Sequence, residues 1–254
     1  MRPFLRRVVP DRLRTYRGDR WRDRVDAATA RAWRVTRGRV QHGPFATMRY
    51  TRTGFSQLGP KLLGTYEQEL HPVIVRLISE GPKRVVNVGA AEGYYAVGLL
   101  MRTSGLRITG FERSAEGRAL MREFARLNGV IDRLDIRGTC TPDTLDQSLG
   151  TEERPRVLMD VEGEEHELLD PRSVPGLGRA EILVEMHEFA QPGVTAEIME
   201  RFGPTHVVSR IAARERTAAT VPTVPGMSHS DVVLAAFERS AEDQEWLWLV
   251  PRDA

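Results

Sequence analysis

The sequence predicts an α/β fold: a Rossmann-like, doubly wound sheet of seven mostly parallel strands with helices on both faces, preceded by an N-terminal helical arm. Two observations predict it. From residue 84 onward, short apolar runs alternate with helix-compatible segments, as in strands joined by crossover helices. The first run ends abruptly at Gly89, and a helix-compatible segment follows from Gly93, as when a buried strand turns tightly into a helix.

Ahead of the sheet, the sequence predicts two helices and one short extended piece. Apolar residues recur at helical spacing over residues 19–35. A second helix is predicted over residues 66–80, where Gly81 and Pro82 end it. Residues 46–50 are strand-like and lie among turn formers.

Each strand of the predicted sheet is a short apolar run followed by a turn and a helix-compatible segment. In the last strand large apolar residues alternate, as on a half-buried strand. The predicted strands cover residues 85–88, 107–111, 134–138, 157–160, 182–186, 206–211 and 246–250. The predicted helices cover residues 93–102, 115–127, 142–149, 164–169, 194–202 and 230–240.

The chain is predicted to divide into a basic N-terminal arm or cap, residues 1–60, and a sheet domain, residues 61–254. Residues 1–40 hold thirteen arginines and four aspartates, a net charge of +9, which leaves −7 for the rest of a chain whose total is +2. This arm is a candidate for covering the acceptor site or for forming a homodimer. Residues 218–230 are loop-like and are a candidate lid.

Composition excludes several classes of protein. No apolar run approaches the roughly 20 residues of a membrane span, and the N-terminus lacks the apolar stretch of a secretory signal. The single cysteine, Cys140, excludes an intrachain disulfide and indicates the cytoplasm. Arginine is enriched throughout, since only Lys61 and Lys83 are lysines among 37 basic residues. Without a basic repeat interleaved with aromatic residues, we expect no nucleic-acid partner.

The turn Gly89-Ala90-Ala91-Glu92-Gly93 carries the first functional signal. Its GxxxG spacing differs from GxGxxG, the spacing that favours a dinucleotide pyrophosphate. Glu92 places a negative charge where a pyrophosphate would sit. The turn therefore favours a ligand with an ammonium or ribose group over a nicotinamide cofactor. The alternative is a turn that only reverses the chain.

Glu112 ends the second predicted strand, at the ribose-binding distance from the turn. It follows Gly93 by 19 positions, and an acid at such a strand end can accept both hydrogen bonds of a ribose diol. Alone, Glu112 is equally well explained as a surface glutamate. Together with the glycine turn, it predicts a nucleoside site.

The strand over residues 157–160 leads into a run of carboxylates. Asp160 and Glu162 are expected to face the cleft. Glu164 and Glu165 are interpreted as acids in the first turn of the following helix, where they favour the helix dipole. All of them cannot be buried and ionised together, because like charges raise one another's pKa.

The strand over residues 182–186 brings a histidine to the same edge. Glu185 and His187 point to the same side because strand residues alternate. A histidine there can act as a general base near neutral pH. The alternative is a histidine that bonds a neighbouring loop.

These motifs resemble a known family. Residues 85–93, with Glu112, resemble the cofactor-binding motifs of class I S-adenosylmethionine-dependent methyltransferases. Asp160-Val161-Glu162-Gly163-x-Glu165, followed by the VEMHE strand, resembles the FkbM-type family. The resemblance covers residues 61–188 and more loosely 245–251. It implies that S-adenosylmethionine binds to residues 61–254 and that a hydroxyl of a small molecule, sugar or secondary metabolite is methylated.

The resemblance also implies residue roles. Gly89, Ala91 and Gly93 would line the methionine part of the cofactor, Glu112 would hold the ribose, and the third strand end would lie beside the adenine. Asn87 stands where many members carry an acid, which weakens that contact. The implied cofactor-binding residues are Glu67, Asn87, Gly89, Ala91, Glu92, Gly93, Glu112, Arg113, Gly138, Thr139 and Asp160.

The predicted catalytic residues are His187, Asp160 and Glu162. Methyl transfer needs a group that accepts the proton of the acceptor, and His187, or alternatively Asp160, is the predicted base. A divalent metal such as magnesium is an alternative, with Asp160, Glu185 and His187 as ligands. Acids near these places hold magnesium in catechol-type and macrocin-type O-methyltransferases, but this chain lacks the Asp-Asn pair of the catechol type.

Three other functions remain open. One is N-methylation of a small amino compound. Another is a nicotinamide-dependent oxidoreductase, which would share the sheet and Glu112 but is disfavoured by the glycine spacing and by Glu92. The third is a non-catalytic nucleoside-binding module, whose expected signature is the loss of the cleft acids. Asp160, Glu162 and Glu185 are all present.

Overall fold

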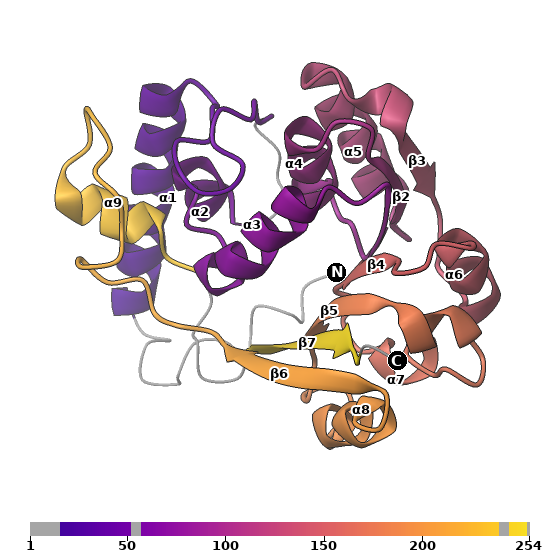
Figure 1. Ribbon diagram of the computed structural model, residues 1–254. Helices are drawn as coiled ribbons and strands as arrows, with labels where there is room; N and C mark the ends of the chain where they lie inside the picture. Colours follow the sequence, from indigo (N-terminus) through magenta and orange to yellow (C-terminus); the bar gives the residue numbers. More distant parts are fainter. Residues whose placement is uncertain (1–15, 52–56, 239–243, 253–254) are drawn as a thin grey trace. The chain divides into compact units, whose positions relative to one another are not determined.

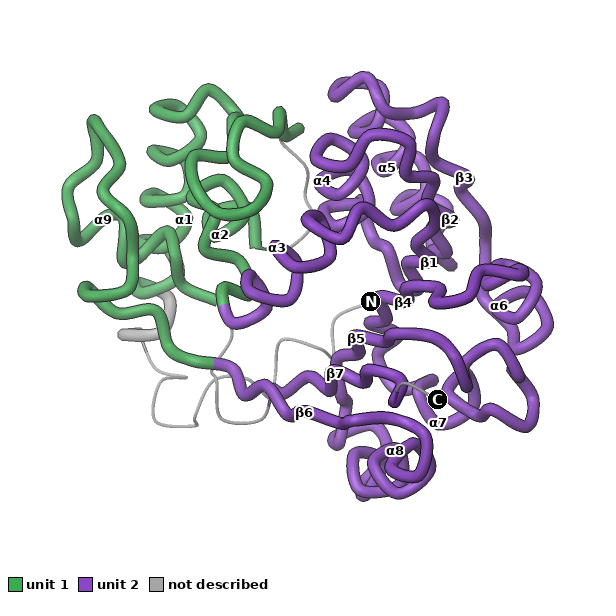
Figure 2. The backbone as a smooth tube through the Cα atoms, in the orientation of Figure 1, with its two compact units in different colours: residues 1–68, 214–242 green, residues 69–213, 243–254 purple. Residues whose placement is uncertain are grey.

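The computed structural model describes residues 16–51, 57–238 and 244–252. The chain forms two compact units (Figure 2). Unit 1 comprises residues 1–68 and 214–242, and unit 2 comprises residues 69–213 and 243–254. None of the helices in the described ranges is long and apolar enough to cross a membrane.

The division into units differs from the predicted boundary at residue 60. Residues 214–242, which include the candidate lid 218–230, belong to the same compact unit as the N-terminal segment. Residues 1–15, which include part of the basic arm, lie outside the described residues, as does the end of the predicted helix 230–240.

The described residues of unit 1 form three helices, two from its N-terminal segment and one from residues 214–238. They are α1 (Tyr16–Thr36), α2 (Leu58–Leu63) and α9 (His229–Ala235). Small residues allow close packing, because a Cβ atom at Gly59 would collide with the carbonyl of Ala235. The guanidinium of Arg31 donates to Asp231 at 2.7 Å and joins α1 to α9. The shared core consists mainly of Ala28, Ala32, Leu63, Val221, Val224, Val232, Leu234, Ala235 and Ala236.

Two predictions ahead of the sheet need correction. The strand-like piece at residues 46–50 makes only an isolated bridge, between Arg39 and Arg49. The helix predicted over residues 66–80 is shorter: a 3-10 turn η3 (Gln68–Leu70) precedes α3 (His71–Glu80). Its late start agrees with a proline in the first turn of α3, since proline fits the start of a helix but not its interior.

A buried ion pair in unit 1 contacts the non-helical segment before α3. Arg216 and Glu238 lie 3.0 Å apart, and both side chains are largely buried. Arg216 donates to the carbonyl of Thr65 at 3.1 Å, and the amide of Glu67 donates to Glu238 at 3.1 Å. Glu67 itself has a positive φ of 45°. Arg216 and Glu238 are far from Thr65 and Glu67 in the sequence, so local sequence patterns cannot predict these contacts.

Unit 2 contains the predicted seven-stranded sheet. Its strand order is β3-β2-β1-β4-β5-β7-β6, and β7 runs antiparallel to both of its neighbours, β5 and β6. The strands are β1 (Arg84–Val88), β2 (Arg107–Phe111), β3 (Leu134–Arg137), β4 (Arg156–Met159), β5 (Glu181–Met186), β6 (His206–Ala212) and β7 (Glu245–Pro251). The doubly wound, mostly parallel prediction is therefore confirmed.

Helices cover both faces of this sheet (Figure 1). On one face, α6 (Pro142–Leu149), α7 (Glu165–Leu168) and α8 (Val194–Phe202) pack on branched side chains from the central strands. The opposite face carries α3, α4 (Tyr94–Arg102) and α5 (Ala115–Leu127). The largest core residues of the first face include Phe111, Leu145, Leu149, Met159, Ile198 and Phe202.

Buried charges attach α3 to the sheet. Arg156 of β4 lies 2.7 Å from Glu80 of α3 and 3.4 Å from Glu181 of β5. The indole of Trp248 donates to the second oxygen of Glu181 at 3.0 Å. Arg76 lies over the Trp248 ring at 4.9 Å. Since Arg156 is shared by two acids, its removal leaves Glu181 buried and unpaired by a cation.

We predict that Arg156→Ala lowers the free energy of unfolding of the chain by about 3 kcal/mol, the usual cost of breaking a buried ion pair. Urea unfolding followed by circular dichroism measures it. Arg172→Ala is the control, because Arg172 also pairs with an acid but its side chain is 86% exposed, so no change is expected. Equal effects of the two substitutions would contradict the assignment.

Candidate active site

The candidate site lies where the strand order reverses. β2 and β3 lie on one side of β1, and β4, β5 and the remaining strands lie on the other. Ligands of doubly wound sheets bind beyond the carboxyl ends of the strands at such a point. Here these ends carry the glycine turn after β1 and the carboxylate segment after β4. The amide of Asp160 donates to the carbonyl of Val88 at 3.0 Å, so the two segments begin in contact.

The glycine turn touches the carboxylate segment through its backbone. Gly89 has a φ of 73°, and a Cβ atom there would fall on the carbonyl oxygen of Asp160. A side chain at this position is therefore excluded twice, by conformation and by space. The amide of Ala90 donates to the carbonyl of Phe111 at 2.8 Å, which fixes the turn against β2 as well.

Glu112 bridges the turn to the end of β2. One carboxylate oxygen accepts from the amide of Ala91 at 2.9 Å, and the other accepts from the amide of Ser114 at 2.6 Å. The carboxylate is thus held in one orientation beside the turn. Each oxygen has lone pairs beyond the one used, so Glu112 can also accept from a diol.

The other implied cofactor residues have varied surroundings. Glu92 is buried within the turn, and Asn87 is buried in β1, where its side chain donates to the carbonyl of Leu158 at 3.4 Å. Arg113 is exposed and lies 3.4 Å from Glu164. Gly138 and Thr139 are exposed after β3, and open space surrounds Gly138. Glu67 belongs to unit 1.

His187 lies in a cage of carboxylates. Its Nδ1 atom is 2.5 Å from the Oε1 atom of Glu165. Its Nε2 atom faces Asp160 and Glu185 at 3.5 Å each, and Glu162 at 3.6 Å. His187 and Glu185 are each 2% exposed, whereas the side chains of Asp160 and Glu162 are about two-fifths exposed. The cage is therefore buried on the β5 side and open on the Asp160 side.

The cage keeps the imidazole of His187 charged. Burial alone lowers its pKa, but hydrogen bonds to Glu165 and Glu185 and the charge of Asp160 outweigh this effect and raise the pKa to about 10. His187 therefore holds its proton at neutral pH. As long as this proton stays, His187 is not available to act as a base.

Glu165 is the residue whose role the sequence interpretation missed. We expected it to be an acid in the first turn of a helix, but it is fully buried against His187. The amide of Gly163 also donates to its Oε1 atom at 3.2 Å. Within the DVEGEE segment, the burial of one acid among four depends on the fold of the loop. The only signal in the sequence is the glycine that allows this loop to turn back.

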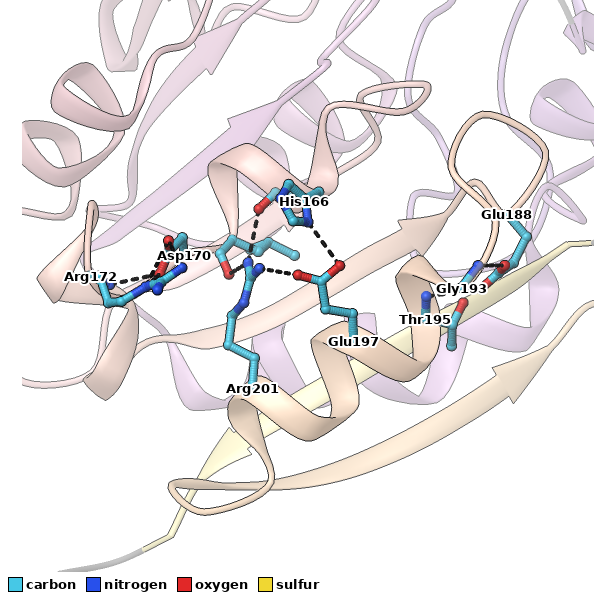
Figure 3. A network of polar contacts seen from close by, with 9 residues as sticks. His166, Asp170, Arg172, Glu188, Gly193, Thr195, Glu197 and Arg201 are labelled. Carbon is cyan, nitrogen blue, oxygen red and sulfur yellow. Dashed lines mark hydrogen bonds and ion pairs between the residues drawn. The ribbon is translucent and has the colours of Figure 1, made fainter.

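Glu188, next to the cage, has a structural role. Its carboxylate accepts from the amides of Gly193 and Thr195 at 2.6 and 2.9 Å and so caps the start of α8 (Figure 3). The bonds from Thr195 and Gly193 lower the pKa of Glu188. On the same side of the sheet, Glu197 of α8 joins His166 and Arg201. These contacts anchor the segment that follows His187.

Three side chains of the cage lie close enough together to bind one metal ion. Asp160, Glu185 and His187 offer ligand atoms that all lie within 4.8 Å of one another. Two carboxylates and an imidazole form a donor set suited to a divalent cation. A cation there would replace the proton on Nε2, because a metal binds the neutral imidazole.

Two predicted site residues carry backbone strain in unit 2. Ala91 has a φ of 48° and Glu162 a φ of 56°, although neither is glycine. Such conformations cost free energy and cluster at functional sites. Both residues lie in the two segments that meet at Gly89 and Asp160. Their strain therefore agrees with a functional role for this junction.

Comparison with known proteins identifies the fold. No family model matches the chain, and no curated protein matches it. A methyltransferase of Podospora anserina, solved with S-adenosylhomocysteine bound, has a TM-score of 0.50 and 17% identity over 97% of this chain and 99% of that chain. This likeness shows that the chain has the Rossmann-like fold of that methyltransferase.

Other solved structures also match the chain. An O-methyltransferase of Bacillus cereus in complex with S-adenosylhomocysteine has a TM-score of 0.47 and 12% identity, over 89% of this chain and 91% of that chain. The O-methyltransferase TomG of Streptomyces achromogenes, in complex with S-adenosylmethionine, has a TM-score of 0.48 and 13% identity, over 90% of this chain and 89% of that chain.

We predict that stability falls as the pH rises from 7 to 10 in metal-free buffer. The pKa of His187 is raised on folding, so its contribution is complete below the unfolded pKa near 6.5 and is lost as the pH passes the folded value of about 10. The expected slope from this group is about 1 kcal/mol per pH unit. Urea unfolding at several pH values measures it.

The variant Glu165→Gln tests the cause of this pH dependence. Losing the charge beside Nδ1 lowers the pKa of folded His187, so the loss of stability still begins near the unfolded pKa but ends at lower pH and is smaller in total. Glu167→Gln is the matched control, because Glu167 lies on the same short helix but is exposed. Identical pH profiles for the wild type and Glu165→Gln would contradict the role of Glu165.

Proposed function

We propose that the chain is an S-adenosylmethionine-dependent methyltransferase that methylates a hydroxyl group of a small molecule. The observation that carries this proposal is the junction at the sheet reversal. There the glycine turn and the fixed carboxylate of Glu112 form a nucleoside-type site, and it contacts a segment that supplies Asp160 and the His187 cage.

The residues fit the cofactor. Gly89 leaves no side chain at the junction, and Glu112 is oriented by two amides while retaining lone pairs for a ribose. The negative charges of Glu92 and Asp160 suit a ligand with an ammonium and a sulfonium group. Gly138 leaves space at the end of β3, where the adenine would bind. When bound, S-adenosylmethionine supplies an electrophilic methyl group.

The chain's own residues would move the proton. Asp160 is one of the two cage acids with a partly exposed side chain, and we propose that it accepts the proton of the acceptor hydroxyl. Before the transfer, the charged and buried imidazole of His187 lies 3.5 Å from Asp160 and favours the carboxylate form that can accept the proton. His187 becomes the base instead only if its proton is displaced. Glu162 completes the open side of the cage.

A metal-assisted reaction is the second candidate, favoured by the donor set of Asp160, Glu185 and His187. A divalent cation there would lower the pKa of an acceptor hydroxyl.

Further extensions of the proposal are membership of the FkbM-type family, a role in secondary metabolism, a cytoplasmic location and a homodimer through the N-terminal arm. N-methylation of a small amino compound is the alternative for the same site.

We predict that the wild-type chain binds S-adenosylhomocysteine and that Glu112→Gln weakens binding about tenfold, or ~1.4 kcal/mol. The reason is that the amide keeps one accepting oxygen where two are needed. Isothermal titration calorimetry measures the affinity. Glu116→Gln is the matched control, four residues further on and exposed. Binding of NAD in place of S-adenosylhomocysteine would favour an oxidoreductase, and no binding of either would contradict the proposal.

We predict for the metal-assisted alternative that Mn²⁺ binds at one site and that Asp160→Asn weakens it at least about tenfold. Calorimetry with Mn²⁺ alone gives the affinity without knowledge of the acceptor. Glu164→Gln is the control, because Glu164 is an exposed acid of the same segment that pairs with Arg113. If the wild-type chain binds no Mn²⁺, the metal-assisted alternative is wrong.

A further inference from the structure

A cavity lies at the opposite edge of the sheet from the candidate active site. It has a volume of about 430 Å³ and is formed where β1, β2 and β3 begin, beside the end of α6. This volume is in the range of small-molecule sites. The predicted active-site residues lie at the carboxyl ends of the strands, so none of them lines it. Its polar lining includes Arg84, Arg107, Thr109, Asp132, Arg133, Asp135, Arg137 and Ser148.

Two of the four arginines in the cavity are fixed by the protein. Arg133 donates to the carbonyls of Leu100 and Thr103, at 2.5 and 2.9 Å. Arg137 donates to Asp135 at 2.7 Å and to Ser148 at 3.2 Å. Their charges are thereby held in the wall of the cavity. Of the two aspartates that line it, Asp135 is paired with Arg137.

The other two arginines are adjacent and have little compensation. Arg84 and Arg107 are direct partners in the register of β1 and β2. Arg84 approaches Glu152 only to 3.7 Å and its side chain is 55% exposed. The side chain of Arg107 makes no hydrogen bond or ion pair with any residue that the structure describes. Like charges in paired positions repel each other, and an anion between them removes this cost.

A hydroxyl lies beside this pair. Thr109 follows Arg107 by two positions on β2, so both side chains leave the same face of the sheet. Thr109 is half-buried and lines the cavity. Two guanidinium groups and a hydroxyl donor are the groups that recognise phosphate and carboxylate oxygens.

We propose that this cavity binds the anionic group of a small molecule, a phosphate or a carboxylate, through Arg84, Arg107 and Thr109. The proposal is independent of methyl transfer, because it rests on residues of the other sheet edge. The competing explanation is that arginine, which is enriched throughout the chain, is merely solvated there. A solvated pair would show no more affinity for anions than arginines elsewhere on the surface.

Calorimetry with inorganic pyrophosphate and, separately, with citrate tests the proposal at about 150 mM ionic strength, where interactions between exposed charges are largely screened. We expect saturable binding of at least one probe, and the better probe identifies the phosphate or the carboxylate. The double variant Arg84→Gln/Arg107→Gln should lose at least about tenfold in affinity, or ~1.4 kcal/mol. Thr109→Val, which keeps the net charge, should weaken binding as well.

Matched controls separate a built site from net charge. Arg34→Gln/Arg126→Gln removes the same charge at two exposed positions outside the cavity and should change the affinity less than about twofold. If the double variant of the cavity unfolds, the single variant Arg107→Gln repeats the test, because that side chain holds no described partner. Equal binding by the cavity and control variants, or no saturable binding of either probe by the wild type, would overturn the proposal.

Discussion

The close approach of Gly89 to the backbone of Asp160 is the constraint on which the candidate site depends. It joins the turn after β1 to the segment after β4, across the point where the strand order reverses. Because the contact is between backbones, it fixes the glycine turn and the acidic segment of the candidate site together. A larger residue at position 89 would separate the two halves before any ligand is considered.

The second organising feature is electrostatic. Glu165 and Glu185 are buried, and Asp160 and Glu162 lie close by, so the cage would be unstable without a positive charge inside it. The proton of His187 supplies that charge in the absence of another cation. The same surplus of negative charge would favour a metal ion or the ammonium and sulfonium groups of a ligand. A cation that binds in the cage would therefore compete with the proton of His187.

Local patterns predicted the parts of the structure that depend on neighbouring residues. The strand over Arg107–Phe111 and the helix over Ala115–Leu127 follow from apolar runs and turn residues. The glycine turn and Glu112 meet through the amide of Ala91, as the fold class predicts. What sequence reasoning missed depends on distant partners. The burial of Glu165 depends on His187, and the altered start of α3 accompanies the Arg216–Glu238 pair. No local window contains both partners of either contact.

Unit 1 has a consequence for how the chain folds during synthesis. Arg31 of α1 and its partner Asp231 of α9 are 200 residues apart, and the small residues of α1 are buried in the same core. The apolar face of α1 is therefore covered in full only after residues 221–236 have been made, although α2 can pack against it much earlier. During this interval the parallel strands β1 to β5 can pair from contiguous βα segments, but β6 joins the sheet only after β7 has been made, because β7 lies between β5 and β6. Because α9 lies in the connection between β6 and β7, unit 1 can be completed only after most of this connection has been translated.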